Sequence, residues 1–208
     1  NIPFVLADLW KDERDPFKMC PRQVLKSVVG ECKQMGFNPI VGCEYEWFNF
    51  KENSESLRKK KYQNLDPLTY GMYGYSILKT TDTNSYMGDL RKSCESFDLP
   101  LEGLHTETGP GVYEAALSAA PALVAADRAV LFKTATKEIA NKHGVTATFM
   151  SRWCDTLPGS SGHVHISLTD NNNNNIFYDS KSVRKMSKLF EYFLAGQLSC
   201  LPDLLCVF

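Results

Sequence analysis

The sequence has no marked excess of charge of either sign and no long hydrophobic run. Its 208 residues contain 23 Lys and Arg against 24 Asp and Glu, a formal net charge of −1. This balance gives no indication of a polyanionic partner such as nucleic acid. No apolar run reaches the roughly 20 residues of a membrane-spanning helix. We therefore expect neither nucleic acid nor membrane among the partners.

A disulfide framework is also missing. The seven cysteines are odd in number, and no pair has Cys-x-x-Cys spacing. Several lie among apolar residues, which is typical of reduced, mostly buried cysteines in a cytosolic protein. We therefore expect a cytoplasmic location. The length and the 43% hydrophobic content suit one domain with a substantial core.

Acidic and histidine side chains are present on three short segments that we expect to be strands. Glu44 and Glu46 alternate with apolar and aromatic residues, and so do His163 and His165. Residues two apart in a strand project to the same face. Carboxylates side by side on an apolar strand repel each other and lose solvation, and a divalent cation removes both problems. Oxygen ligands combined with imidazole suit Mg²⁺ or Mn²⁺.

The third segment has Glu107 and Glu114 on either side of Gly109-Pro110-Gly111. Glycine and proline in this order force a turn between two strands, so the turn brings the two carboxylates toward each other. Each pattern alone is common on a solvated strand face, but three in one chain predict a metal site. We expect five side chains to converge on one concave face of a sheet: Glu44, Glu46, Glu107, Glu114 and His163.

Hydrophobic periodicity predicts further elements along the chain. We expect strands at residues 1–10, 39–50, 101–107, 112–117 and 145–152, and a histidine strand after a loop at 157–162. We expect helices at residues 21–36, 85–97, 121–144 and 183–198. Residues 51–61 end in a basic run and are expected to be a solvated loop or helix face. The asparagine run at 171–175 is expected at a hairpin tip.

In this order the three segments resemble the catalytic domain of glutamine synthetase. The matching stretches are Glu44–Glu46, Glu102–Glu114, and Thr146–Met150 with Gly159–Leu168. The resemblance runs through nearly the whole chain. It implies an α+β fold, a partial glutamine-synthetase catalytic domain with a curved antiparallel sheet (a half-barrel) and helices on the outer face. Residues 1–208 would then lack the β-grasp domain that precedes this region in the family and the C-terminal part of the catalytic domain.

The resemblance implies an ATP- and metal-dependent ligase that forms glutamine from glutamate and ammonia through γ-glutamyl phosphate. The metal would be Mg²⁺ or Mn²⁺, ATP would be the co-substrate, and the full-length protein would be a homo-oligomer. By resemblance, Glu46, Glu107 and Glu114 hold the metal nearer the substrate. Glu44 and His163 hold the metal nearer the ATP phosphates.

Other positions match the nucleotide and glutamate sites of the family. Glu102 matches the position that meets the ribose, and His105 matches one near the phosphates. His165 and Ser167 match positions on the nucleotide side. Gly159 matches a glycine whose backbone approaches glutamate, where any side chain would intervene.

Several departures from the family pattern keep alternatives open. Pro158-Gly159 stands where the family has Asn-Gly, Val112 stands where it has Gln, and Ser151-Arg152-Trp153 stands where it has Pro-Lys-Pro. These changes suggest a divergent branch, in which a γ-glutamyl-amine ligase would use another amine in place of ammonia. The sequence does not separate this hypothesis from an ammonia ligase.

Two hypotheses from other classes are disfavoured. A non-catalytic relative has no physical reason to keep clustered carboxylates. A guanidino-phosphotransferase on a related fold is at odds with the Gly-Pro-Gly and His-x-His-x-Ser segments. The family's arginines for glutamate and phosphate, and its last metal carboxylate, fall beyond the matched stretch. We therefore expect no synthetase activity from these 208 residues alone.

Overall fold

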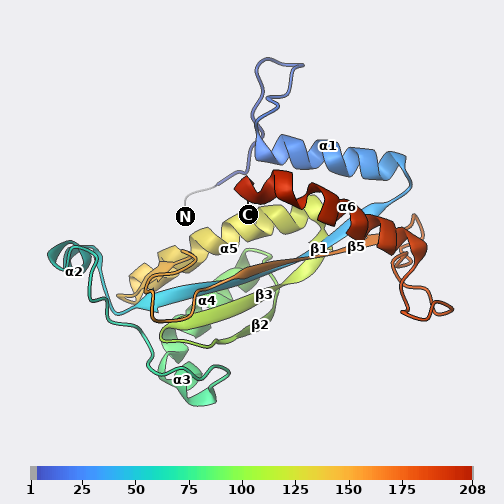
Figure 1. The fold of residues 1–208 in the computed structure, drawn as a ribbon. Helices are drawn as coiled ribbons and strands as arrows, with labels where there is room; N and C mark the ends of the chain where they lie inside the picture. Colours follow the sequence, from blue (N-terminus) through green and yellow to red (C-terminus); the bar gives the residue numbers. More distant parts are fainter. Residues whose placement is uncertain (1–3, 208) are drawn as a thin grey trace. The chain divides into compact units, whose positions relative to one another are not determined.

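The computed structural model describes residues 4–207 and contains one sheet with helices (Figure 1). The helices are α1 (Pro21–Gln34), α2 (Ser54–Lys59), α3 (Ile77–Asp82), α4 (Asn84–Ser96), α5 (Ala122–Lys142) and α6 (Lys188–Leu204), followed by the 3-10 turn η1 (Leu205–Val207). The strands are β1 (Asn38–Phe50), β2 (Leu101–Thr106), β3 (Val112–Pro121), β4 (Thr146–Thr148) and β5 (Gly162–Thr169).

The sheet is open and has the strand order β2-β3-β1-β4, with β5 also paired to β1. β2 and β3 are antiparallel, with His105 opposite Glu114. β1 and β4 are antiparallel, with Phe48 opposite Thr148. The expected α+β class with an antiparallel sheet is therefore confirmed.

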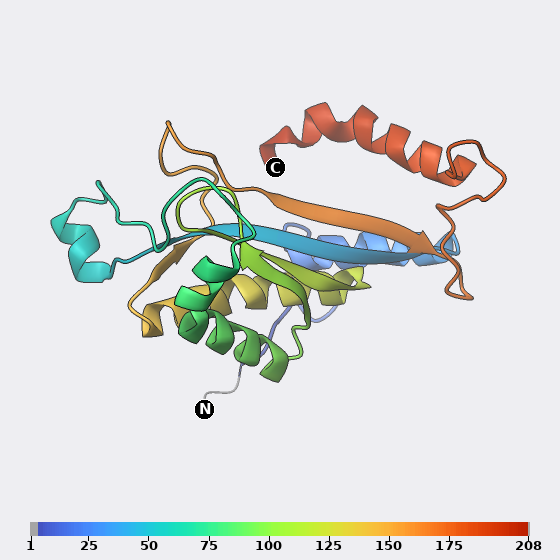
Figure 2. The ribbon, with the colours of Figure 1, turned by 90° about the horizontal axis from the view of Figure 1, so that it is seen from below.

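Two compact units can be distinguished along the chain. The central unit comprises residues 42–120 and 124–165, and the remaining residues form the terminal unit. In the central unit, α4 and α5 lie on the same side of β1 and β3 (Figure 2). Their apolar residues form one core with the strands: Trp47, Tyr86, Leu90, Cys94, Tyr113, Ala115, Phe132 and Ala140.

Strand β1 alternates as the sequence predicts. Cys43 and Trp47 are buried on the helix side, where Tyr45 also packs against the core. The indole Nε1 of Trp47 donates to Asn49 Oδ1 at 2.9 Å, so its one polar group is satisfied. The intervening Glu44 and Glu46 consequently project to the other face, on which Phe48 and Phe50 form a smaller apolar cluster further along the strand.

The turn between β2 and β3 is clamped onto β1. Gly109 and Gly111 have φ angles of 122° and 71°, which side chains rarely tolerate. A Cβ on Gly111 would lie 2.4 Å from the Asn49 carbonyl oxygen. The backbone and side-chain amides of Asn49 donate to the Gly111 carbonyl at 2.8 Å and 3.2 Å. The predicted Gly-Pro-Gly turn is therefore confirmed, and its register relative to β1 is fixed.

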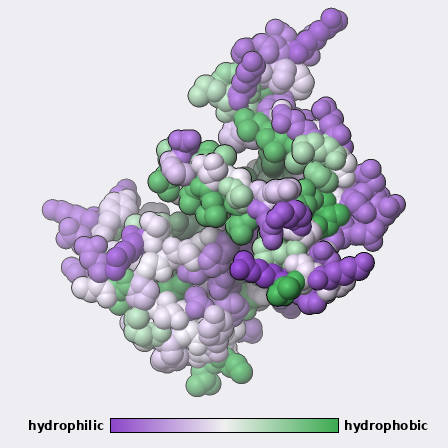
Figure 3. Space-filling view, turned by 45° about the vertical axis from the view of Figure 1, so that its right-hand side comes forward, coloured by the Kyte–Doolittle hydropathy of each residue, from purple (hydrophilic) through white to green (hydrophobic). Residues whose placement is uncertain are grey.

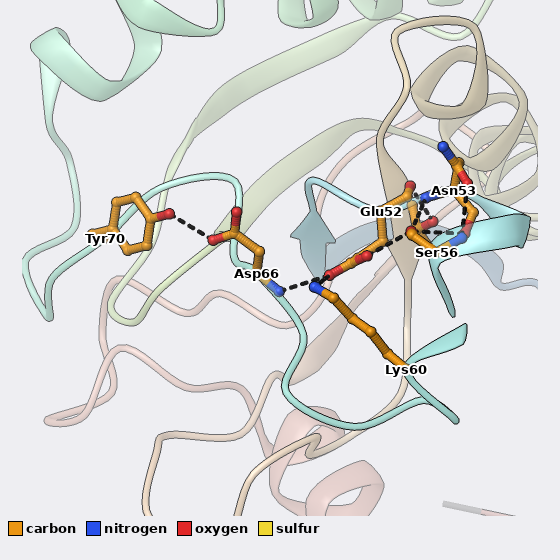
Figure 4. A network of polar contacts seen from close by, with 7 residues as sticks. Glu52, Asn53, Ser56, Lys60, Asp66 and Tyr70 are labelled. Atoms are coloured by element: carbon orange, nitrogen blue, oxygen red, sulfur yellow. Dashed lines mark hydrogen bonds and ion pairs between the residues drawn. The ribbon is translucent and has the colours of Figure 1, made fainter. Parts of the chain in front are cut away.

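The polar segment after β1 contains α2 and a buried carboxylate network (Figure 4). Glu52 is only 2% exposed, accepts from Ser56 Oγ at 2.6 Å and from the Asp66 amide at 3.0 Å, and pairs with Lys60. The hydrogen bond from Lys60, followed by that from Ser56, lowers the pKa of Glu52 to about 2. Asp66 in turn accepts from the Tyr70 hydroxyl at 2.5 Å. The segment is thus tied to the end of β1.

The first predicted strand is wrong in its described part. Residues 4–9 have no strand structure, and Trp10 makes only an isolated bridge with Pro16; residues 1–3 lie outside the described part of the chain. Side chains hold this segment instead of a strand ladder. Asp8 accepts from Arg22 at 2.5 Å and from Lys26 at 2.6 Å, both on α1.

Other predicted elements differ in extent. β4 is shorter than residues 145–152 because the chain turns at Arg152, whose guanidinium donates to three loop carbonyls: Cys154, Asp155 and Leu157. The last helix begins at Lys188 rather than at residue 183, because Ser187 caps it through Phe190 N at 3.2 Å. Helix α3 was not predicted. Helix α4 ends one residue earlier than predicted, and Phe97, which follows it, is exposed.

The terminal unit also contains the asparagine run. Thr169 bridges to Asn175 and Asp170 accepts from the amides within the run, which confirms the predicted hairpin tip. Helix α6 exposes the apolar side chains of Leu198 and Leu201, and η1 exposes that of Leu205. Figure 3 shows apolar surface interspersed with polar surface on one face of the molecule. Among the described residues, no helix combines the length and apolar character needed to span a membrane.

Candidate metal centre

The first cluster of the site joins β1 to β5. Glu44 Oε2 lies 2.9 Å from His163 Nδ1, and Glu44 Oε1 lies 3.2 Å from His165 Nε2. Because the histidines are two apart on a strand, their rings stand on the same face, with centroids 6.3 Å apart. The hydrogen bonds from His163 and then His165 lower the pKa of Glu44. The pair of Glu44 with His163 expected from the sequence is present, and His165 joins it.

The second cluster joins β2 to β3. His105, Glu107 and Glu114 offer ligand atoms that all lie within 4.8 Å of one another. His105 Nε2 is 3.6 Å from Glu114 Oε2. Burial raises the pKa of Glu114, the imidazole of His105 opposes this effect, and neighbouring carboxylates add to it. The clamped turn brings Glu107 and Glu114 together as expected, and His105 joins them although the resemblance places it near the phosphates.

Glu46 stands between the two clusters in β1 and is held by the loop before β5. Its Oε2 accepts from the Ser161 amide at 3.0 Å and its Oε1 from the Ser161 hydroxyl at 2.8 Å. Its charge still raises the pKa of Glu114, as do the charges of Glu107 and Glu44. The four carboxylates therefore act on one another on one face of the sheet. Ser161 was missed by the sequence analysis, because a serine in a Gly-Ser-Ser-Gly loop is common.

The donor set fits a divalent cation. Within the described residues, Glu107 Oε2 is buried without a hydrogen-bond partner. A buried carboxylate oxygen without a partner is unfavourable, and a cation would satisfy it. Carboxylate oxygens and imidazole nitrogens are ligands of hard or borderline divalent metals.

Tyr75 is a second residue that the sequence analysis missed. The neighbouring Glu107 carboxylate raises the pKa of Tyr75. The ring of Tyr75 lies 4.9 Å from that of His105, centroid to centroid. Its φ angle is +52°, an unfavourable conformation that marks a constrained position. The sequence offered only the neighbouring Gly74 as a sign of this contact. In the structure, a Cβ on Gly74 would lie 2.9 Å from the Glu107 carbonyl carbon.

Besides Glu46, three expected site residues lie outside both clusters. Glu102 is exposed at a register shift between Leu101 and Gly103, so strand alternation does not determine its direction. At Gly159 a Cβ would lie 2.6 Å from the Ser151 carbonyl oxygen, so its own loop already requires a glycine there. Ser167 belongs to the terminal unit.

The structure is thus that of an α+β protein. Its open sheet bears two clusters of carboxylate and imidazole groups. Residues 18–208 match the family model described as "Glutamine synthetase, catalytic domain". The chain belongs to that family.

Individual relatives support the assignment. The chain is 45% identical to Type-1 glutamine synthetase 2 of Dictyostelium discoideum, over 100% of this chain and 40% of the relative. It is 31% identical to the glutamate–isopropylamine ligase of a Pseudomonas species, over 98% of this chain and 44% of the relative. A solved GmaS–ADP complex superposes with a TM-score of 0.81 at 25% identity, covering 92% of this chain and 43% of that one. The chain thus spans less than half the length of these relatives.

Proposed function

We propose that the full-length protein is an ATP-dependent ligase that joins glutamate to ammonia through γ-glutamyl phosphate, with Mg²⁺ or Mn²⁺ as the metal. The observation that carries this proposal is the carboxylate face, on which Glu107 Oε2 is buried without a partner. The named activity of the 45% identical relative supports the reaction. The structural neighbour GmaS forms a complex with ADP, which supports ATP as co-substrate.

The proposed ligand roles follow the resemblance. Glu46, Glu107 and Glu114 hold the cation on the glutamate side, and Glu44 and His163 hold the one on the phosphate side. A bound cation would neutralise the encounter between the substrate carboxylate and the γ-phosphate. The clamped turn and the Ser161 hydrogen bonds keep the carboxylates in place before any cation arrives.

The remaining site assignments are part of the same proposal. Glu102, His105, His165 and Ser167 are assigned to ATP, and Gly159 to glutamate. His105 and His165 are themselves members of the two clusters, so either ring can also contact a cation there. We further propose a homo-oligomer, and a cytoplasmic location that is supported by the free state of all seven cysteines.

A γ-glutamyl-amine ligase is the second candidate. A groove of 560 Å³ opens beside the second cluster, lined by Tyr75, Ile77, Thr80, Leu104 and His105. It has room for the alkyl group of an amine larger than ammonia. The 31% identical relative is named for such a reaction. Comparing product formation from ammonia and from isopropylamine by the full-length protein separates the two candidates.

The metal assignment is tested by Glu107→Gln in the full-length protein. This change keeps the shape of the side chain and removes one charge from the glutamate-side cluster. Removing a group that hydrogen-bonds to a metal ligand typically lowers metal affinity or activity 10–100-fold. Removing a ligand itself should therefore lower them by at least about the same factor. The measurement is glutamate-dependent ATP hydrolysis during titration with Mg²⁺ and Mn²⁺.

Asn173→Gln, at the hairpin tip, is the control and should change nothing comparable. If Glu107→Gln kept full activity and an unchanged metal requirement, the metal assignment would be wrong and a non-catalytic role would have to be considered again.

A further inference from the structure

A second pocket in the central unit lies on the side of the sheet that carries the helices. It has a volume of 450 Å³ and is lined by Lys51, Thr69, Tyr70, Tyr73, Lys79 and Asp82, among others. Thr83 also lines it, and its hydroxyl lies 2.7 Å from that of Tyr113. Tyr113 and Glu114 are adjacent in β3 and project to opposite faces. This two-lysine pocket is therefore separate from the carboxylate clusters.

Lys79 is the buried charge of the pocket. It is 6% exposed, and its Nζ donates to the Tyr73 carbonyl at 2.6 Å and lies 4.0 Å from the centroid of the Tyr73 ring. Burial lowers the pKa of Lys79. Within the described residues, no carboxylate oxygen lies within 4.0 Å of this ammonium group. The Nζ also donates to the Gly71 carbonyl at 3.4 Å. Two carbonyls and a ring face orient the charge but do not neutralise it.

Lys51 is the second cation of the pocket. Its Nζ lies 4.9 Å from the centroid of the Tyr70 ring. The Tyr70 hydroxyl is anchored on Asp66, whose amide is anchored on Glu52, as Figure 4 shows. The carboxylate network of this segment therefore fixes the aromatic wall on which Lys51 rests.

The acidic groups nearby are already engaged or do not pair with the lysines. Glu52 is taken up by Lys60, Ser56 and the Asp66 amide. Asp82 lines the pocket, but among the described residues it forms no ion pair with Lys51 or Lys79 at 4.0 Å or less. Among the lining residues, two ammonium groups stand against the one carboxylate of Asp82, and the Asp66 carboxylate behind Tyr70 is held by the hydroxyl of that residue. An anion that enters would offset the unfavourable burial of the Lys79 charge.

We propose that the two-lysine pocket binds a small organic anion that carries a carboxylate or phosphate group. The two ammonium groups bind the anionic group as point charges. The Tyr70 and Tyr73 rings, together with Leu68, contact the apolar part of the ligand. The pocket is large enough for a molecule of several carbon atoms in addition to the anionic group.

Calorimetric titration with inorganic phosphate and with acetate, in buffer freed of divalent cations by a chelating resin, tests the proposal. Without divalent cations no phosphate is recruited to the carboxylate face, so the result does not depend on the proposed ligase function. We expect binding of one anion per chain. Lys51→Met and Lys79→Met should each weaken it at least about tenfold, the effect typical of losing one hydrogen bond to a charged group. Tighter phosphate or tighter acetate binding identifies the group that the ligand carries.

Lys133→Met is the matched control. Lys133 also rests on aromatic faces, 5.2 Å from the Phe149 centroid and 5.8 Å from that of Tyr45, but it does not line the pocket. It should leave anion binding unchanged. If Lys79→Met fails to fold by circular dichroism, the exposed Lys51 still provides the test. Absence of binding to either anion, or equal affinity of Lys51→Met and the unaltered protein, would overturn the proposal.

Discussion

The two faces of β1 in the central unit differ in what holds them together. On one face Trp47 is fully buried and packs against α4 and α5. On the other face Glu44 and Glu46 lie among further carboxylates and are held by donors from the segment around β5. The first face contributes the larger apolar core, whereas the second combines these like charges with a smaller buried cluster of Phe48, Phe50 and Val112. The larger part of the core therefore lies on one face, and the proposed chemistry depends on the other.

The largest expected effect is on the helix-bearing face. Trp47→Ala removes a fully buried indole and its hydrogen bond to Asn49. Truncations of this kind lower the free energy of unfolding by about 3–5 kcal/mol. Urea denaturation measures the change. Val164→Ala, at an exposed position in β5, should stay within about 0.5 kcal/mol. If Trp47→Ala lowered the free energy of unfolding by less than about 1 kcal/mol, the helix-bearing face would not be the main source of stability.

An intermediate effect is expected from Ser161→Ala. The hydroxyl donates to Glu46 Oε1 at 2.8 Å, and its removal leaves the carboxylate freer to rotate. Because groups that orient a metal ligand typically contribute 10–100-fold, Mn²⁺ affinity should fall about tenfold while stability changes little. Calorimetric Mn²⁺ titration measures this.

Ser160→Ala is the neighbouring control, since that hydroxyl donates to the Met150 carbonyl at 2.8 Å and not to a carboxylate. Equal Mn²⁺ affinities of both variants and the unaltered protein would show that Glu46 needs no such support. Metal binding on the carboxylate face would then not depend on the hydrogen bonds that Ser161 donates.

The smallest effect concerns the pH dependence of stability. The pKa of Glu114 is raised above its usual 4.5, with burial as the first cause. A carboxyl group whose pKa rises on folding destabilises the folded protein at neutral pH, and this penalty disappears as the pH falls below about 4.5. Glu114→Gln should therefore stabilise the metal-free protein at pH 7 by about 1 kcal/mol or less, because the group is partly solvated.

Thermal unfolding in EDTA, from pH 7 down to pH 4, measures this difference. The two proteins should converge at the acid end. With Mn²⁺ present the order should reverse, because the variant lacks a proposed ligand. A variant that is less stable than the unaltered protein in EDTA at pH 7 would show that this carboxylate is not strained by its neighbours.

Sequence reasoning succeeded where a local rule decides the outcome. Alternation in β1 places Glu44 opposite to Trp47, and the glycines of the Gly-Pro-Gly turn bring Glu107 toward Glu114. It failed where distant contacts decide. Tyr75 reaches Glu107 only through a left-handed backbone conformation, and Ser161 reaches Glu46 from 115 residues away. Neither is encoded by a period of two or 3.6 residues.

The distance along the chain between Glu44 and His163 has a consequence for folding kinetics. Their contact closes a separation of 119 positions, and such long-range pairings form slowly because chain entropy must be lost before the contact is made. Strands between these two residues pair with partners that are much closer along the chain, as β2 and β3 do in their hairpin. The cluster of Glu44 with the two histidines is thus expected to assemble late. Cation binding there would select fully folded chains and slow their unfolding.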